Sequence, residues 1–256
     1  MTRIAVIGLG EAGSLYAAGF REAGARVRGY DLRPRLADGG QVDRLADAIE
    51  GAEIVVSLVG AAASLEVAEE ALPLLEPSAI FADFNTSSPD LKDRIAAIGA
   101  SRGVDVVDVA VLAPVPREAE RTPLLASGRG AERLAELLRP LGAPVVVLDQ
   151  PAGAAARMKL LRSVFTKGLA TLMIETLGAA RAAGAEDWVR GQIASELGDQ
   201  GPALLDRFVA GTYQHAERRE HEVRDVLAAL EETGQPSDMT RGTLAWFQRI
   251  LAERPA

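Results

Sequence analysis

Lysine is rare in this chain, and one lysine lies where its chemistry stands out. Only three of the 28 lysine and arginine residues are lysines, and Lys159 falls inside a long, largely apolar stretch rich in alanine, leucine and methionine. A lysine loses its proton when it is removed from water, whereas an arginine keeps its charge. A lysine in such surroundings therefore suits general acid/base catalysis near neutral pH.

Polar residues continue along one face of the same segment. Ser163 lies four residues after Lys159, which places both on one side of a helix, and Thr166 and Lys167 extend that side. Helical periodicity alone leaves two interpretations of Lys159 open. It is either a catalytic group, or a structural lysine that forms an ion pair or extends its ammonium to solvent.

A glycine-rich turn near the start of the chain has the spacing of a dinucleotide-binding site. It consists of Gly8, Leu9, Gly10, Glu11, Ala12 and Gly13, between a β-branched run and an amphipathic segment. The first glycine permits the tight turn, the second lets the backbone approach a pyrophosphate, and the third allows close packing of helix on strand. The helix that follows offers N–H donors and the positive end of its dipole. These residues are expected to bind a nicotinamide dinucleotide.

An acidic residue after the second expected strand bears on which dinucleotide binds. Asp31 lies 18 residues after Gly13, where a carboxylate accepts hydrogen bonds from the adenosine ribose. A carboxylate there repels a 2′-phosphate, so Asp31 favours NAD over NADP. Arg33, two residues later, is a phosphate-binding group that keeps NADP open as the alternative cofactor.

Alternating strands and helices are expected to position these residues. Strands are predicted at residues 3–7, 26–30, 54–58, 79–82, 104–109 and 145–148, with a candidate edge strand at 123–127. Helices are predicted at residues 12–23, 42–49, 61–72, 89–100 and 132–138. This alternation predicts an α/β protein whose N-terminal part is a doubly wound Rossmann sheet.

The pattern changes after residue 150, where no further strand is expected. Residues 152–183 predict one long helix, followed by shorter helices at 186–197, 203–210, 213–233 and 238–253. The long segment is apolar on all sides, so we expect it to be buried between domains or subunits, with a homodimer formed along residues 160–177. The predicted organisation is a Rossmann NAD(P)-binding domain over residues 1–150 and an all-helical substrate and dimerisation domain over residues 151–256.

Composition excludes several kinds of function. The net charge of −8 argues against partners such as nucleic acids and anionic membranes, which attract positive charge. The absence of cysteine excludes disulfides, thiolate metal sites and thiol nucleophiles. No apolar run is long enough to span a membrane, and the first expected strand leaves no room for a signal peptide. We expect a cytoplasmic protein that acts on a small molecule without a metal ion.

Four segments together resemble the β-hydroxyacid dehydrogenase superfamily, which includes 3-hydroxyisobutyrate and 6-phosphogluconate dehydrogenases. The matching segments are the glycine turn with Tyr-Asp-x-x-Pro at residues 30–34, Ser-Leu-Val at 57–59, the loop at 83–89, and Gly153, Lys159 and Ser163. The resemblance covers residues 1–180 and is closest to a poorly characterised, 6-phosphogluconate-dehydrogenase-like branch with a short helical C-terminal domain. It implies that Leu58, Val59 and Thr86 contact the cofactor and that Lys159 and Ser163 are catalytic.

The match fails where the superfamily holds its substrate. The asparagine four residues after the catalytic lysine is Ser163 here, and the Ser-Gly-Gly of the substrate loop is replaced by Leu112, Ala113 and Pro114. A proline donates no N–H. No lysine follows Lys167, so a second lysine that many members carry has no counterpart. The substrate is therefore expected to be held by other groups.

The C-terminal domain offers such groups in residues 213–222, which contain both histidines. His215 and Arg219 share one helix face, and so do Arg218 and Glu222. An arginine fork suits a carboxylate or a phosphate, so the candidate substrate-binding residues are His215, Arg218 and Arg219, with Ala113, Pro114 and Thr122 from the first domain. The structural alternative is a solvated helix face with ion pairs.

The sequence therefore predicts an oxidoreductase that transfers a hydride between a nicotinamide and a small β-hydroxy acid or hydroxy amino acid. Lys159 is expected to be the general acid/base, and substrate is expected between the domains. Decarboxylation of a β-keto product stays open. One alternative is an imine reductase, although such relatives usually carry another proton donor in place of this lysine. The other is an NAD(P)-binding sensor that performs no redox chemistry.

Overall fold

The β-branched runs of the first half form one mixed sheet in the computed structural model, which describes residues 1–33 and 40–253. Its strands are β1 (Arg3–Ile7), β2 (Arg26–Tyr30), β3 (Ile54–Ser57), β4 (Ile80–Asp83), β5 (Asp105–Val111), β6 (Leu124–Ser127) and β7 (Val145–Val147). Their order is β2-β1-β3-β4-β5-β6-β7, and among these strands only β5 and β6 pair antiparallel. The expected α/β class with a doubly wound sheet is confirmed.

The placement of β6 differs from the expected one. Its segment was predicted to lie at an edge, but it pairs with β5 on one side and with β7 on the other, where Leu124 faces Val145 in register. The edge prediction is wrong because β7 adds on beyond β6. Pro123, which has no N–H to give, lies just before the strand and so does not interrupt the ladder.

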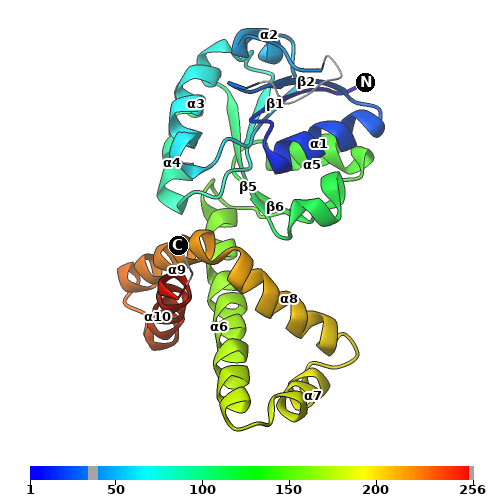
Figure 1. Ribbon diagram of the computed structural model, residues 1–256. Coiled ribbons are helices and arrows are strands. Elements are labelled where there is room, and N and C mark those ends of the chain that lie inside the picture. Colours follow the sequence, from blue (N-terminus) through cyan, green and yellow to red (C-terminus); the bar gives the residue numbers. More distant parts are fainter. Residues whose placement is uncertain (34–39, 254–256) are drawn as a thin grey trace. The chain divides into compact units, whose positions relative to one another are not determined.

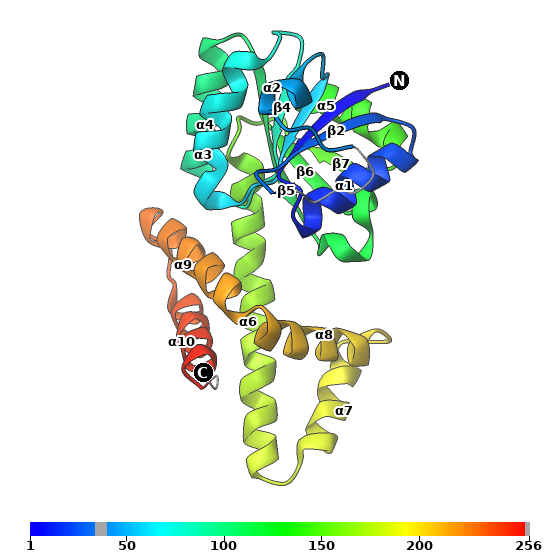
Figure 2. The ribbon, with the colours of Figure 1, turned by 45° about the horizontal axis from the view of Figure 1, so that its top comes forward.

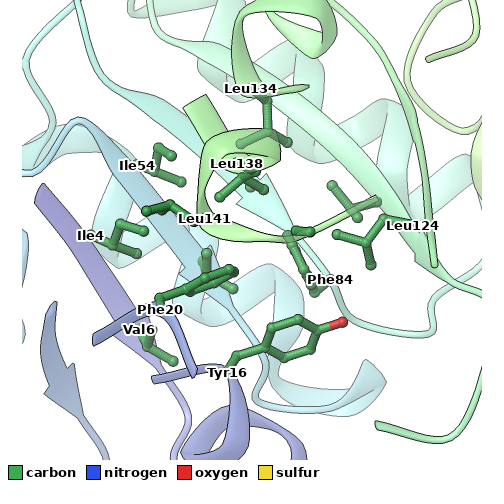
Figure 3. Close-up of a cluster of buried hydrophobic side chains, with 14 of the residues drawn as sticks. Ile4, Val6, Tyr16, Phe20, Ile54, Phe84, Leu124, Leu134, Leu138 and Leu141 are labelled. Atoms are coloured by element: carbon green, nitrogen blue, oxygen red, sulfur yellow. The ribbon is translucent and has the colours of Figure 1, made fainter. Parts of the chain in front are cut away.

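Helices cover both faces of the sheet (Figures 1 and 2). One face packs α1 (Glu11–Glu22) and α5 (Ala131–Leu138) around Tyr16, Phe20, Leu134 and Leu138 (Figure 3). The other face packs α2 (Leu45–Ile49), α3 (Ser64–Ala71) and α4 (Pro89–Ser101) around Phe81 and Ile95. Burial on both faces explains why the central strands are continuous apolar runs rather than alternating ones.

The chain divides into two compact units, Met1–Lys159 and Leu160–Ala256. The last strand ends at Val147, and the first turns of the next helix, α6 (Ala154–Ala182), still belong to the first unit. The boundary by contacts thus falls nine residues beyond the residue 150 expected from the strand pattern. Lys159 is the last residue of the sheet-containing unit.

Helices joined by short turns make up the described residues of the second unit. After α6 it contains α7 (Glu186–Glu196), α8 (Gly201–Gln214), α9 (Ala216–Glu232) and α10 (Asp238–Ala252). One apolar cluster joins α6, α9 and α10 around Phe247, and another joins α6 with α7 and α8 around Leu205. The helix predicted to start at residue 213 instead starts at Ala216, because α8 continues to Gln214 and His215 separates the two. No described helix is long and apolar enough to cross a membrane.

Candidate functional site

The glycine turn has the backbone that a bound pyrophosphate requires. Gly8 has φ +89°, and a Cβ there would lie 2.5 Å from the Leu58 carbonyl oxygen. A Cβ on Gly13 would lie 1.9 Å from the Gly8 carbonyl oxygen, whereas one on Gly10 would meet no atom within 4 Å. Two glycines thus close the turn onto its surroundings, and the middle one leaves open space. A nicotinamide dinucleotide fits this arrangement, with the first N–H groups of α1 directed to its phosphates.

Leu9, Glu11 and Ala12, predicted to contact the cofactor, differ in exposure and in hydrogen bonding. The Leu9 side chain is buried and its N–H donates to Asp31 Oδ2 over 2.8 Å, so Leu9 closes the turn rather than facing a ligand. Glu11 is exposed and Ala12 is half-buried in the first turn of the helix. Their contribution to phosphate binding would come from backbone N–H groups.

Asp31 ties the end of β2 to the glycine turn. Its Oδ2 accepts the Leu9 N–H and its Oδ1 accepts the Arg33 N–H over 2.9 Å. A carboxylate has about four lone-pair sites, so both oxygens keep a site for the hydroxyls of a ribose. Pro34, the last residue of the matching Tyr-Asp-x-x-Pro segment, lies outside the described residues.

Leu58 and Val59 continue from β3 at the same edge of the sheet. The Leu58 N–H donates to the Ile7 carbonyl over 2.7 Å, which brings the β3 loop against the glycine turn. Both side chains are half-buried against the two apolar cores. Because β1 and β3 run parallel, the Leu58–Val59 pair and the turn emerge at one edge.

A row of buried polar side chains crosses the sheet near this edge. Ser57 pairs in register with Asp83, Asp83 with Asp108, and Asp108 with Ser127, on β3 to β6. All four are at most 1% exposed. Partners in register point to the same face, so these four side chains form one polar row under α4.

Asn85 fastens the loop that follows β4. Its N–H and Nδ2 both donate to Asp83 Oδ1, over 3.0 and 2.6 Å, and its Nδ2 also donates to Ser57 Oγ over 3.0 Å. Its Oδ1 accepts the Gly60 N–H over 2.8 Å. Thr86, the next residue, is thereby presented on an exposed loop whose anchor is buried.

Lys92 lies between the two aspartates of the polar row, and no sequence motif predicted a role for it. It is on α4 and only 1% exposed; its Nζ lies 3.1 Å from Asp83 Oδ2 and 3.3 Å from Asp108 Oδ1, and donates to the Asp83 carbonyl oxygen over 2.7 Å. The helix that carries it begins with Ser88 as N-cap and Pro89 at its first position. We name Asp83, Lys92 and Asp108 the buried triad.

Asp108 also holds the start of α6. Its Oδ2 accepts the N–H groups of Gly153 and Ala156, over 3.1 and 2.9 Å, and Ser127 Oγ accepts the N–H of Ala155 over 3.0 Å. Helix starts have N–H groups without an intrahelical partner, and these two strand residues satisfy three of them. The start of α6 is therefore capped by side chains from β5 and β6.

Lys159, three residues after Ala156 on α6, reaches the loop that follows β4. Its Nζ donates to Thr86 Oγ1 over 3.0 Å, and the side chain is half-buried. Two of the predicted site residues are thus brought together from positions 73 apart in the chain. An amine at the carboxyl edge of a parallel sheet can exchange protons with a ligand bound there.

The three predicted substrate-binding residues of the first unit differ in their exposure to solvent. Ala113 is half-buried and Pro114 is exposed, just after β5. Thr122 is fully buried, and its hydroxyl donates to the Ala119 carbonyl oxygen over 2.8 Å. A hydroxyl bonded inside the domain is not available to a substrate, which corrects the expectation for Thr122. Its packing neighbour is Tyr16, whose pKa is raised by burial.

In the helical unit, four charged residues form a cluster. Lys167 Nζ lies 2.8 Å from Glu222 Oε2, and Arg218 lies 2.5 Å from Glu222 Oε1. Arg219 donates to Thr212 Oγ1 over 2.7 Å. Burial lowers the pKa of both Lys167 and Arg219, and Glu222 acts in the opposite sense on each. Ser163 lines a small depression here with Lys167 and residues of α9 and α10.

The cluster carries more positive than negative charge. His215 and Arg218 are exposed, whereas Arg219 is half-buried over Gly211, whose missing side chain leaves room for the guanidinium. Lys167 and Arg218 form ion pairs with Glu222, and Arg219 lies within electrostatic range of the same carboxylate, so a further anion would be stabilised there.

Comparison with known families agrees with this geometry, which defines a Rossmann-type nicotinamide dinucleotide-binding protein. Residues 3–149 match the NAD binding domain of 6-phosphogluconate dehydrogenase, and residues 180–250 match a domain of unknown function, DUF1932. The chain belongs to the first of these families, which covers more than half of it. The resemblance to the β-hydroxyacid dehydrogenase superfamily is thereby confirmed.

Two curated relatives share parts of the chain. An uncharacterized 28.5 kDa protein from Methanothermus fervidus is 26% identical over 207 residues, which is 80% of this chain and 78% of the relative. A 3-hydroxyisobutyrate dehydrogenase from Pseudomonas aeruginosa is 31% identical over 121 residues, 43% of this chain and 41% of that enzyme.

Solved structures share nearly the whole chain. A conserved hypothetical protein from Sinorhizobium meliloti has a TM-score of 0.78 at 34% identity, over 97% of this chain and 88% of that one. A 3-hydroxyisobutyrate dehydrogenase from Salmonella typhimurium has a TM-score of 0.82 at 18% identity, over 97% and 94%. A reductive aminase from Aspergillus terreus has a TM-score of 0.65 at 17% identity, over 98% and 94%. The dehydrogenase and the aminase share the fold of this chain, as their TM-scores show, at sequence identities of only 18% and 17%.

Proposed function

We propose that this protein is an NAD(P)-dependent oxidoreductase that transfers a hydride between a nicotinamide and a small β-hydroxy acid or hydroxy amino acid. The hydrogen bond from Lys159 to Thr86 carries the proposal. It places an amine on the loop after β4, at the edge where the glycine turn follows β1, because these strands run parallel. Ligands of open α/β sheets bind at that edge.

Lys159 would move the proton in both directions of the reaction. In oxidation its neutral amine accepts the hydroxyl proton, while the C–H bond of the same carbon breaks and its electron pair leaves with hydrogen as hydride. A bound nicotinamide supplies the acceptor for that hydride. In reduction the ammonium donates a proton to the developing alkoxide and stabilises its negative charge. Thr86 orients the amine, and Ser163 would contribute a hydroxyl where the superfamily has asparagine.

The cofactor is proposed to be NAD, with NADP as the alternative. Asp31 supports NAD, since its carboxylate is fixed by the turn and repels a 2′-phosphate. Arg33, whose N–H is bonded to that carboxylate, is the group that would favour NADP. Fluorescence titrations with NADH and NADPH distinguish the two cofactors directly.

The charged cluster of the helical unit supports an anionic substrate. Glu222 already faces both Lys167 and Arg218, while Arg219 donates to the hydroxyl of Thr212. An arginine has five N–H donors in a fixed fork, so Arg219 keeps donors for a carboxylate or phosphate. We include Arg218 and His215 as neighbouring groups of the same anion site.

Replacement of Lys159 by methionine tests the proposal. We expect turnover to fall by about 10²–10⁴, the usual contribution of a general acid/base, while NADH binding is retained. The measurement is a panel of hydroxy acids followed by NADH absorbance, alongside an NADH titration. Arg157→Met is the matched control, since it removes an exposed charge from the same helix. A Lys159→Met variant within about tenfold of the parent rate would contradict the assignment.

Two other functions are separated by the same experiment. The shared fold with a reductive aminase makes imine reduction a second candidate, so the panel includes ketone and amine pairs. A protein that binds NADH but turns over neither class would be a nucleotide sensor. Decarboxylation is read from carbon dioxide release alongside the oxidation.

A further inference from the structure

The buried triad joins the two segments that carry the Lys159–Thr86 hydrogen bond. Asp83 anchors the loop that presents Thr86, and Asp108 caps the start of the helix that presents Lys159. Lys92 is the one residue of the described network in ionic contact with both carboxylates. The relative position of the loop and the helix start therefore depends on a third residue that touches neither Lys159 nor Thr86 in the described contacts.

The charges of the triad give this link its strength. One ammonium lies between two carboxylates, all three at 1% exposure, so the triad itself has a net charge of −1. That remaining negative charge falls at Asp108 Oδ2, which faces the N–H groups at the positive end of α6. Without Lys92, two buried carboxylates in register on adjacent strands would repel each other.

The path from the triad to Lys159 is short and stiff. The Ala156 N–H is held by Asp108, and Lys159 follows it by three residues, which is less than one helical turn. A shift of the helix start therefore moves Lys159 with it. Displacements of about 1 Å at a reacting group cost about 10²-fold in rate.

We propose that Lys92 is a positioning residue, which fixes Lys159 against Thr86 by bridging Asp83 and Asp108. For its catalytic consequence this inference rests on the proposed function of Lys159. Its structural consequence is independent of that function, because the position of Lys159 can be observed without any substrate.

The test separates positioning from simple stability with two variants. Lys92→Met leaves two facing carboxylates, whereas Lys92→Met/Asp83→Asn removes one of them and leaves Asp108 with its three donors. We expect the double variant to regain thermal stability relative to the single one. We expect its turnover to stay about 10- to 100-fold below the parent, with nucleotide affinity retained. Turnover that recovers together with stability would show that Lys92 is only structural and would overturn the proposal.

The spectroscopic readout uses the three lysines of the chain. Labelling with lysine enriched in ¹³C at Cε gives three side-chain signals, assigned with Lys159→Arg and Lys167→Arg variants. Thr86→Val provides the reference shift of Lys159 when its hydrogen bond is absent. In the double variant the Lys159 signal should move toward that reference, while the Lys167 signal stays in place. A Lys159 signal that coincides with the parent signal would contradict the positioning role.

The two readouts fail independently. If the parent protein oxidises no hydroxy acid but the Lys159 signal moves as expected, the proposed function fails and the positioning stands. If turnover depends on Lys159 but its signal is unchanged in the double variant, the proposed function stands and the positioning fails.

Discussion

At the scale of single residues, the three lysines of the chain have three different surroundings. Lys92 is buried between two aspartates, Lys159 is half-buried and bonded to Thr86, and Lys167 is paired with Glu222. A buried ammonium needs a counter-charge because desolvation penalises it heavily. Lys159 donates to a hydroxyl, whereas the ammonium groups of Lys92 and Lys167 lie against carboxylates.

A prediction at this scale concerns Arg219. Removing its guanidinium by Arg219→Gln should raise KM for an anionic substrate by roughly 10- to 100-fold, because a hydrogen bond to a charged group contributes about 1.5–3 kcal/mol. KM for a neutral analogue should be unchanged. Arg190→Gln on α7 is the control, since that arginine pairs with Asp206 at the surface. An equal effect on the neutral analogue would speak against an anion site.

At the scale of elements, two glycines of the turn have different roles: Gly13 allows close packing, and Gly10 leaves space for a ligand. Gly13 packs so closely on Gly8 that no side chain fits, whereas Gly10 has φ −63°, which alanine adopts freely, and faces open space. One glycine serves the fold and the other leaves room for a ligand. The two glycines can therefore be tested separately, one by its effect on stability and the other by its effect on nucleotide binding.

The corresponding prediction compares Gly13→Ala with Gly10→Ala. Gly13→Ala should lower the free energy of unfolding by about 1–3 kcal/mol or more, the usual result of overpacking. Gly10→Ala should change it by less than about 0.5 kcal/mol, as an open surface position does, yet weaken NADH binding. Urea unfolding and fluorescence titration measure the two effects. Unchanged NADH affinity in Gly10→Ala would show that the phosphates do not approach this face.

Sequence patterns predicted most of the elements because their causes are local. β-Branched runs and the glycine spacing act over a few residues, and the strands and first helices follow them. The role of Lys92 could not be predicted, since it depends on the register that sets Asp83 beside Asp108. The one available signal was a lysine on the apolar face of a helix, beside Ile95.

The contacts of Thr122 and the position of β6 depend on long-range packing in the same way. The hydroxyl of Thr122 turns inward because the loop folds back on itself, and β6 is interior because β7 arrives later in the chain. Of the candidate site, the Lys159–Thr86 pair joins two residues that separate motifs had singled out. Its buried support came from three-dimensional structure alone.

At the scale of the whole molecule, one long helix exposes an apolar face. Leu161, Phe165 and Leu172 of α6 are 50%, 67% and 54% exposed, at spacings of four and seven residues. Such a stripe lies on one side of a helix, and exposed apolar stripes mark association surfaces. A homodimer along residues 160–177 stays our proposal for its partner.

The prediction for the molecule is its mass in solution. Light scattering at micromolar concentration should give twice the mass of the chain, and Phe165→Asp should give a monomer. Met239→Asp is the control, because that residue is equally exposed but lies on α10. A parent protein that scatters as a single chain would refute the dimer.

The cap that Asp108 and Ser127 place on α6 also has a consequence for biosynthesis. These two side chains become buried with the sheet, yet their N–H partners at Gly153, Ala155 and Ala156 are translated after the last strand. A nascent chain that ends at residue 150 would contain every strand found among the described residues and still lack these three N–H donors. We therefore expect the nucleotide-binding unit to finish folding only after the first turn of the helix that carries Lys159 has been synthesised.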